Sequence, residues 1–218
     1  MCEVINTLKF TIKFSFVVLF IIFNNSFAKV DSESWSSMGF GIKLPYSLKL
    51  DLEQSLRLKD NSSSFKQTFT ETIISYNRLK KVKVFIPVRY AVFKNKIKKR
   101  ISLGASYKHN FKIISFRYRS MLQRTYQHEK IFDPLIRNKF TLSSKINKKL
   151  KPYLSQEFSH LSKNGQFNYD EFRFSIGARI NLGKKRETKI FYTQKIESLS
   201  NKNRDRTNIF GISYAFDW

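Results

Sequence analysis

The sequence predicts an all-β fold, an antiparallel up-and-down transmembrane β-barrel of about 10 to 12 strands. Three observations predict it. Apolar and polar residues alternate along most of the chain after Trp35, short and long connections separate the alternating stretches, and the chain ends on an alternating aromatic stretch. A period of two is typical of a strand with one apolar and one polar face.

The first 28 residues are predicted to be a secretory signal peptide that is cleaved. Lys9 and Lys13 precede an apolar run over residues 14–23, and Ser26 and Ala28 supply small residues before the cut. The apolar run is too short for a helix that spans a bilayer, which needs about 20 residues. We therefore expect residues 29–218 to form one exported domain, the barrel, in the bacterial outer membrane.

The alternation is clearest over residues 171–182, where every even-numbered residue is apolar and every odd-numbered one is polar or glycine. Residues 48–53 alternate leucine with charged residues, and residues 114–122 place Arg117 and Arg119 between apolar neighbours. The lengths suit tilted membrane strands, which need about 9 to 11 residues in the bilayer. The predicted strands are residues 35–44, 47–58, 65–76, 82–93, 100–108, 111–124, 135–146, 150–161, 169–182, 189–197 and 207–218.

The connections are predicted to alternate in length, as the periplasmic turns and external loops of such a barrel do. The short ones are residues 45–46, 77–81, 109–110, 147–149 and 183–187, and the longer ones are residues 59–64, 94–99, 125–134, 162–168 and 198–206. An odd number of strands makes the first run parallel to the last, whereas bacterial single-chain barrels have even numbers. We therefore expect ten strands, with residues 35–44 outside the wall, or twelve, with one strand missed.

Charged residues recur on the polar face of nearly every predicted strand, and we expect them to point into the barrel. Charges in a narrow interior are tolerated where they are paired or hydrated. We expect the glutamates to pair with the arginines and fill the interior, which favours a structural role over a solute pathway. The predicted network is Glu53, Arg57, Arg89, Arg117, Arg119, Arg137, Glu157, Glu171 and Arg173.

The last strand ends on Tyr214, Phe216 and Trp218 at alternate positions. It resembles the C-terminal strand by which bacterial outer-membrane barrels are recognised by their insertion machinery, with Gly211 upstream. Aromatic residues near a strand end also suit the membrane interface. We expect these three residues to be the insertion signal.

The chain has 41 Lys and Arg against 16 Asp and Glu, and one cysteine. One cysteine excludes a disulfide framework or a Cys-rich zinc site, and we expect no metal and no cofactor. Many of the basic residues lie in predicted connections, such as residues 94–100 and 184–186. We expect outer-membrane lipids and lipopolysaccharide as their counter-charge, and not nucleic acid.

The exported part also resembles a family of short bacterial barrels, domain-of-unknown-function family 2490. The resemblance implies location and fold and no activity. It lies in Trp35, Leu56-Arg57, Val88-Arg89-Tyr90, Arg100, residues 116–119, residues 133–138, Tyr153, Glu157-Phe158, Arg173 and Gly177.

His160 and Ser162 offer the one candidate for catalysis. They share a predicted strand face and precede Asn164-Gly165, loosely like the stretch of outer-membrane phospholipases and lipid A deacylases in which His activates Ser, although Lys163 interrupts the motif. The sequence favours a structural or narrow-pore barrel over an enzyme. A lipid hydrolase using His160 and Ser162, and a soluble periplasmic basic β-protein, are the alternatives.

Overall fold

The computed structural model describes residues 30–79, 81–163, 166–199 and 204–218. The predicted signal peptide lies outside the described residues. Every regular element of the described residues is a strand. Among them there is no helix with the length and apolarity needed to span a membrane.

The strands follow one another as a meander. Their bounds are β1 Val30–Lys43, β2 Leu48–Lys59, β3 Ser64–Tyr76, β4 Val82–Phe93, β5 Lys96–Phe111, β6 Ile114–Gln127, β7 Lys130–Ile131, β8 Leu135–Ser144, β9 Leu150–Lys163, β10 Gln166–Gly183, β11 Arg186–Glu197 and β12 Asp205–Asp217.

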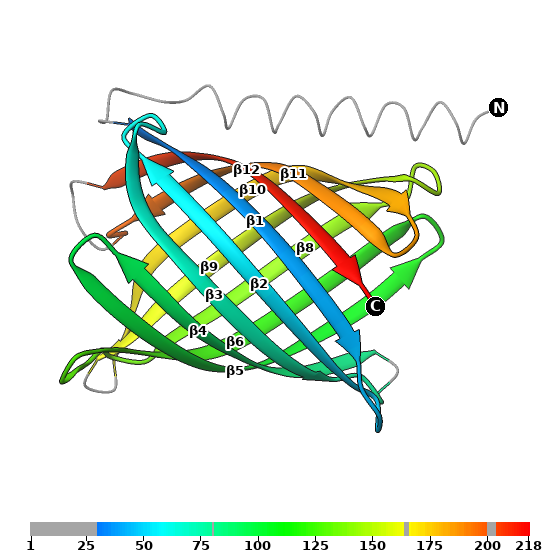
Figure 1. Ribbon diagram of the computed structural model, residues 1–218, viewed down its shortest axis with the longest axis horizontal. Coiled ribbons are helices and arrows are strands. Elements are labelled where there is room, and N and C mark those ends of the chain that lie inside the picture. Colours follow the sequence, from blue (N-terminus) through cyan, green and yellow to red (C-terminus); the bar gives the residue numbers. More distant parts are fainter. Residues whose placement is uncertain (1–29, 80, 164–165, 200–203) are drawn as a thin grey trace.

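Eleven of these strands close into a barrel, as Figure 1 shows. Neighbours in sequence pair in antiparallel fashion, and β6 pairs directly with β8. The short β7 pairs only with the end of β6 and stays outside the wall. The predicted all-β barrel of 10 to 12 strands is therefore confirmed.

The barrel is closed by a parallel pair, β1 with β12, from Val30↔Arg206 to Gly41↔Asp217. The expectation of an even number of strands is therefore wrong, and so is the option that places residues 35–44 outside the wall. An odd number of meandering strands leaves the first and last pointing the same way. A parallel ladder satisfies their backbone groups nearly as well as an antiparallel one.

Three predicted connections are also wrong. Strand β9 continues to Lys163 and β10 begins at Gln166, so most of the long loop predicted over residues 162–168 belongs to strands. Strand β5 continues to Phe111, which pairs with Ile114 of β6, so His109 and Asn110 lie in a strand and the turn is at residues 112–113. Strand β4 ends at Phe93 and β5 begins at Lys96, so the predicted long loop is a two-residue turn. Polar residues on both faces of these strand ends resembled loop sequence.

The two faces of the wall have opposite character. Phe210 and Ile212 are more than half exposed (58% and 52%), whereas Thr207 and Ile209, which point to the other face of β12, are buried (5% and 0%). Most other exposed large apolar side chains also lie at alternate strand positions, as the pleat requires. The outer face is therefore mainly apolar, and the interior carries Ser, Gln, Arg and Glu.

Two interior aromatic rings lie against glycines of neighbouring strands. A Cβ added to Gly104 would overlap the ring of Phe85, and one added to Gly211 would overlap the ring of Phe191. Glycine at these positions leaves room for a ring to lie across the wall. Gly211, predicted upstream of the insertion signal, therefore also has a packing role.

Candidate functional site: the barrel interior

Several adjoining cavities lie inside the described part of the barrel, and three of them contain the predicted network; a further one, about 450 Å³, lies at the rim beside the β1–β12 seam. The central cavity, about 230 Å³, is lined by residues from β1 to β4, β6 and β8 to β12. The second, about 370 Å³, lies towards the ends of β4 and β5 at residues 93 and 98; we call it the arginine chamber because Arg57, Arg89, Arg100, Arg137 and Arg173 line it. The third, about 390 Å³, lies at the opposite end and includes Asn77 and Lys81; we call it the turn-side cavity.

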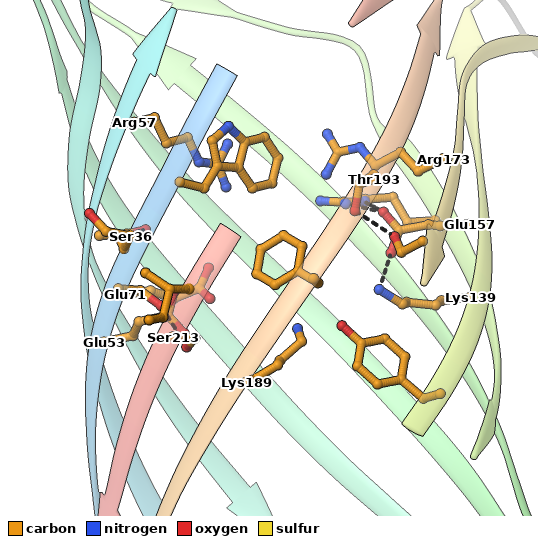
Figure 2. Close-up of a pocket in the computed structure, with 18 of the residues that line it drawn as sticks. Ser36, Glu53, Arg57, Glu71, Lys139, Glu157, Arg173, Lys189, Thr193 and Ser213 are labelled. Carbon is orange, nitrogen blue, oxygen red and sulfur yellow. Dashed lines mark hydrogen bonds and ion pairs between the residues drawn. The ribbon is translucent and has the colours of Figure 1, made fainter. Parts of the chain in front are cut away.

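All nine residues of the predicted network line these cavities. Seven of them line the central cavity, Glu171 lines the arginine chamber and Arg117 lines the turn-side cavity. Figure 2 shows Arg57, Glu53 and Glu71 on one wall, and Glu157, Lys139 and Arg173 on the opposite wall.

Glu157 of β9 holds the largest group of cations, which we call the Glu157 cluster. Its carboxylate is buried, with 3% of the side chain exposed, and lies 2.9 Å from Arg119 Nη2. Arg137 donates to the other carboxylate oxygen, Oε1. Lys139 Nζ lies 4.0 Å from Oε2, the oxygen that faces Arg119. Three cations from β6 and β8 thus converge on one carboxylate, because the register places Lys139 directly opposite Glu157 and Arg137 two residues along.

Two simpler ion pairs lie beside this cluster. Glu171 Oε1 is 2.6 Å from Arg173 Nε on the same face of β10. Glu71 Oε1 accepts a hydrogen bond from Arg89 Nε at 2.8 Å, between directly paired positions of β3 and β4. The predicted network does not include Glu71, which also lines the central cavity.

Arg57 is held by aromatic rings instead. Its guanidinium carbon lies 3.6 Å from the centre of the Trp35 ring and 4.9 Å from that of Phe69. The guanidinium carbon of Arg89 lies 3.8 Å from the centre of the same Phe69 ring, and that of Arg173 lies 5.6 Å from the centre of the Trp35 ring. Arg89, Phe69, Arg57, Trp35 and Arg173 therefore form an alternating series of cations and rings, each contact favourable through the ring quadrupole.

Glu53 and Arg117 take part in no ion pair that we find within the described residues. Glu53 lies opposite Glu71 in the β2–β3 register. Arg117 lies opposite Lys108 and faces the turn-side cavity with Lys83 and Arg119. The structure therefore does not place every predicted glutamate beside an arginine.

Sequence reasoning missed a second buried carboxylate, Glu33, which is 1% exposed. Its carboxylate accepts hydrogen bonds from Trp35 Nε1 at 2.8 Å and Lys66 Nζ at 2.5 Å, and Lys195 Nζ lies 3.8 Å away. The first strand was predicted to begin at Trp35, which left Glu33 outside the barrel. Its position two residues before Trp35, on the same strand face, is the signal that could have revealed it.

His160 and Ser162 lie on the outer face. They alternate along β9 with Glu157 and Ser159, both buried at the interior. The His160 ring lies 4.4 Å from the ring of Tyr169 on β10. Within the described residues we find no hydrogen bond between His160 and Ser162 and no carboxylate that orients the imidazole, so this region lacks the geometry of a triad.

Tyr214, Phe216 and Trp218 also point outward. Phe216 lies 5.9 Å from Phe40 and 6.3 Å from Trp218, centre to centre. The backbone N–H of Trp218 donates to the carbonyl of Gly41 at 2.7 Å. The last residues are therefore fixed against β1 at the parallel seam.

A family model described as "Protein of unknown function (DUF2490)" matches residues 32–206. The chain belongs to this family. The match confirms the resemblance seen in the sequence. It spans the barrel from β1 to the start of β12.

Two solved structures are similar to this chain. One is titled "NanC porin structure in rhombohedral crystal form", with 8% identity and a TM-score of 0.49 over 75% of this chain and 86% of that chain. The other is titled "Bacterial polysaccharide outer membrane secretin", with 8% identity and a TM-score of 0.49 over 77% of this chain and 73% of that chain. No curated protein matches the chain.

Proposed function

We propose that this protein is an exported outer-membrane β-barrel that acts as a narrow pore with a preference for small anions. One observation carries the proposal: the central cavity, the arginine chamber and the turn-side cavity adjoin one another along the interior, and each of these three has more basic than acidic residues in its lining. A further cavity beside the β1–β12 seam, at the barrel rim, has four acidic and three basic residues, so the excess of positive charge belongs to the other three. Arg57, Arg89, Arg137 and Arg173 line both the central cavity and the arginine chamber. Arg119 lines both the central and the turn-side cavities.

The charge balance supports a preference for anions. The central cavity has Arg57, Arg89, Arg119, Arg137, Arg173, Lys139 and Lys189 against Glu53, Glu71 and Glu157. The turn-side cavity has Lys81, Lys83, Lys108, Arg117 and Arg119 against Asp51. An interior lined by one sign of charge and walled by low-dielectric material concentrates the opposite ion.

The outer face supports a location in a membrane. A closed barrel leaves no unpaired strand edge, and its large apolar side chains point away from the interior. Fractionation of cells that express the chain, followed by a heat-modifiability gel, tests this. A barrel in the outer-membrane fraction shifts its mobility on boiling; recovery as a soluble periplasmic protein contradicts the proposal and favours the soluble alternative.

Conductance tests the pore itself. The purified barrel in a planar bilayer should give small, discrete current steps, and under a salt gradient the reversal potential should have the sign of anion selectivity. A purely structural barrel gives no steps in the same bilayer after its folding is verified by the gel. Cation selectivity contradicts the proposed preference.

We propose outer-membrane lipids, including lipopolysaccharide, as the partners of the outer face, with basic rim residues facing their phosphates. We also propose that the barrel-insertion machinery recognises Tyr214, Phe216 and Trp218. Replacement of Phe216 by Ala should slow assembly in cells, whereas Phe210→Ala, a more central outward residue on the same strand, should slow it less.

The lipid hydrolase is a separable alternative. It requires that the pure barrel hydrolyse phospholipid or lipid A acyl esters and that Ser162→Ala abolish this. The outer-face placement of His160 and Ser162 is compatible with a lipid substrate, but the missing triad geometry makes the pore the better supported function.

A further inference from the structure

We infer that the arginine chamber is a binding site for a small solute that carries a carboxylate or phosphate group, held chiefly by Arg57 and Arg100. This inference rests on the proposed pore, because the solute reaches the chamber through the barrel.

The five arginines of the chamber differ in their partners. Arg89, Arg137 and Arg173 each have a carboxylate, from Glu71, Glu157 and Glu171 respectively. Arg57 and Arg100 form no ion pair that we find within the described residues. Their Nε atoms are shielded from solvent and have no hydrogen-bond partner there.

The strand register places Arg100 opposite another arginine, which is unfavourable in a sheet. Arg100 of β5 lies directly opposite Arg89 of β4, and both point into the chamber. Two like charges at directly opposed positions destabilise a sheet. Arg57 adds a third positive charge within electrostatic range of both. An oxyanion between them would remove this repulsion.

The chamber is also built to hold such a group in place. Stacking on Trp35 and Phe69 fixes Arg57, and a side chain that is fixed beforehand loses little freedom on binding. Two buried amides, Gln67 and Gln123, line the same chamber and offer further donors. A volume of about 370 Å³ is within the range of small-ligand pockets.

The ligand class follows from these groups. The planar guanidinium fork matches the two oxygens of a carboxylate or phosphate and binds chloride without that geometry. The chamber's carboxylates, Asp170, Glu171 and Glu197, come from β10 and β11. The oxyanion would therefore lie against the opposite wall, formed by β2 to β5.

Trp35 offers a direct readout because it touches Arg57. The only other tryptophan is Trp218, so the full-length barrel with Trp218→Phe reports on Trp35 alone. Inorganic phosphate or succinate, added in turn, should change the Trp35 fluorescence saturably at an ionic strength where chloride does not. The probe with the lower apparent Kd identifies which oxyanion the site prefers.

Two variants test whether the oxyanion binds in the arginine chamber. Arg100→Gln should weaken binding of the preferred probe by about tenfold or more. Arg117→Gln is the matched control, since Arg117 is also an interior arginine for which we find no ion pair but lines only the turn-side cavity; it should leave the apparent Kd unchanged. A heat-modifiability gel verifies that each variant is folded.

Two results would overturn the site: no saturable response to either probe in the folded barrel, or an equal loss in Arg117→Gln. Conductance separates this failure from that of the pore. Anion-selective current without a fluorescence response rejects the site and keeps the pore. Saturable binding without current rejects passage through the barrel and keeps the site only as one that the solute reaches from one end of the interior.

Discussion

The β6–β9 wall and the β2–β5 wall of the barrel both crowd cations together, but they stabilise them differently. In the Glu157 cluster, Arg119, Arg137 and Lys139 share a buried carboxylate. On the opposite wall, Arg57 stacks between aromatic rings and Arg100 faces Arg89. Interior arginines can therefore hold a barrel together or remain available to a solute, and their partners decide which.

The largest effect is expected from removing the shared carboxylate. Glu157→Gln leaves three cations in the interior without their acceptor, and losing one partner of a buried ion pair costs about 3 kcal/mol or more. Denaturant unfolding of the barrel in lipid measures this loss. A loss below about 1 kcal/mol would mean that water, and not Glu157, stabilises the cluster.

A double variant isolates the interaction between Glu157 and Arg119. In Glu157→Gln with Arg119→Leu, one stranded cation is gone, so the combined loss should be smaller than the sum of the two single losses. A structural cluster also predicts that this variant is less stable but conducts as the parent barrel does. A changed single-channel current would show that the Glu157 cluster also controls permeation.

The next effect concerns the aromatic wall. Trp35→Leu removes the ring between Arg57 and Arg173 and the hydrogen bond to Glu33, and should lower the free energy of unfolding by about 2 kcal/mol. The same denaturant measurement applies. Trp218→Phe is the control, because Trp218 is 70% exposed and should change stability little.

A third variant removes the carboxylate partner of an interior arginine, Arg89, so that Arg89 resembles Arg57 and Arg100. Glu71→Gln removes the ion pair of Arg89 but also relieves repulsion between Glu71 and Glu53, which are opposite each other. The net loss of stability should be only about 1 kcal/mol. The reversal potential should move further towards anion selectivity, while Glu71→Asp should leave its sign and size nearly unchanged. An unchanged potential in Glu71→Gln would place the selective region elsewhere.

The contrast between the walls explains what the sequence can and cannot predict. Alternation identified the barrel and the inward face of all nine network residues, because the pleat is a local property. Closure by β1 and β12 is a contact between distant segments, so local patterns could not reveal that eleven strands suffice. The partner of each arginine depends on register across strands. The sequence drew attention to Trp35 as the start of the first predicted strand. Its stacking on Arg57 was not predicted, because that contact depends on how β1 and β2 pair.

The smallest effect is expected at the barrel rim. Asp217 lies 2.7 Å from Lys49, as close as the ion pairs of the interior, but the Asp217 side chain is 52% exposed. Lys49 also keeps a second partner, Asp51, at 2.7 Å. Asp217→Asn should therefore change the free energy of unfolding by less than about 0.5 kcal/mol, and added salt should reduce even that difference. A loss comparable with that of Glu157→Gln would show that exposure does not separate the two kinds of ion pair, and that the β1–β12 seam depends on its polar end.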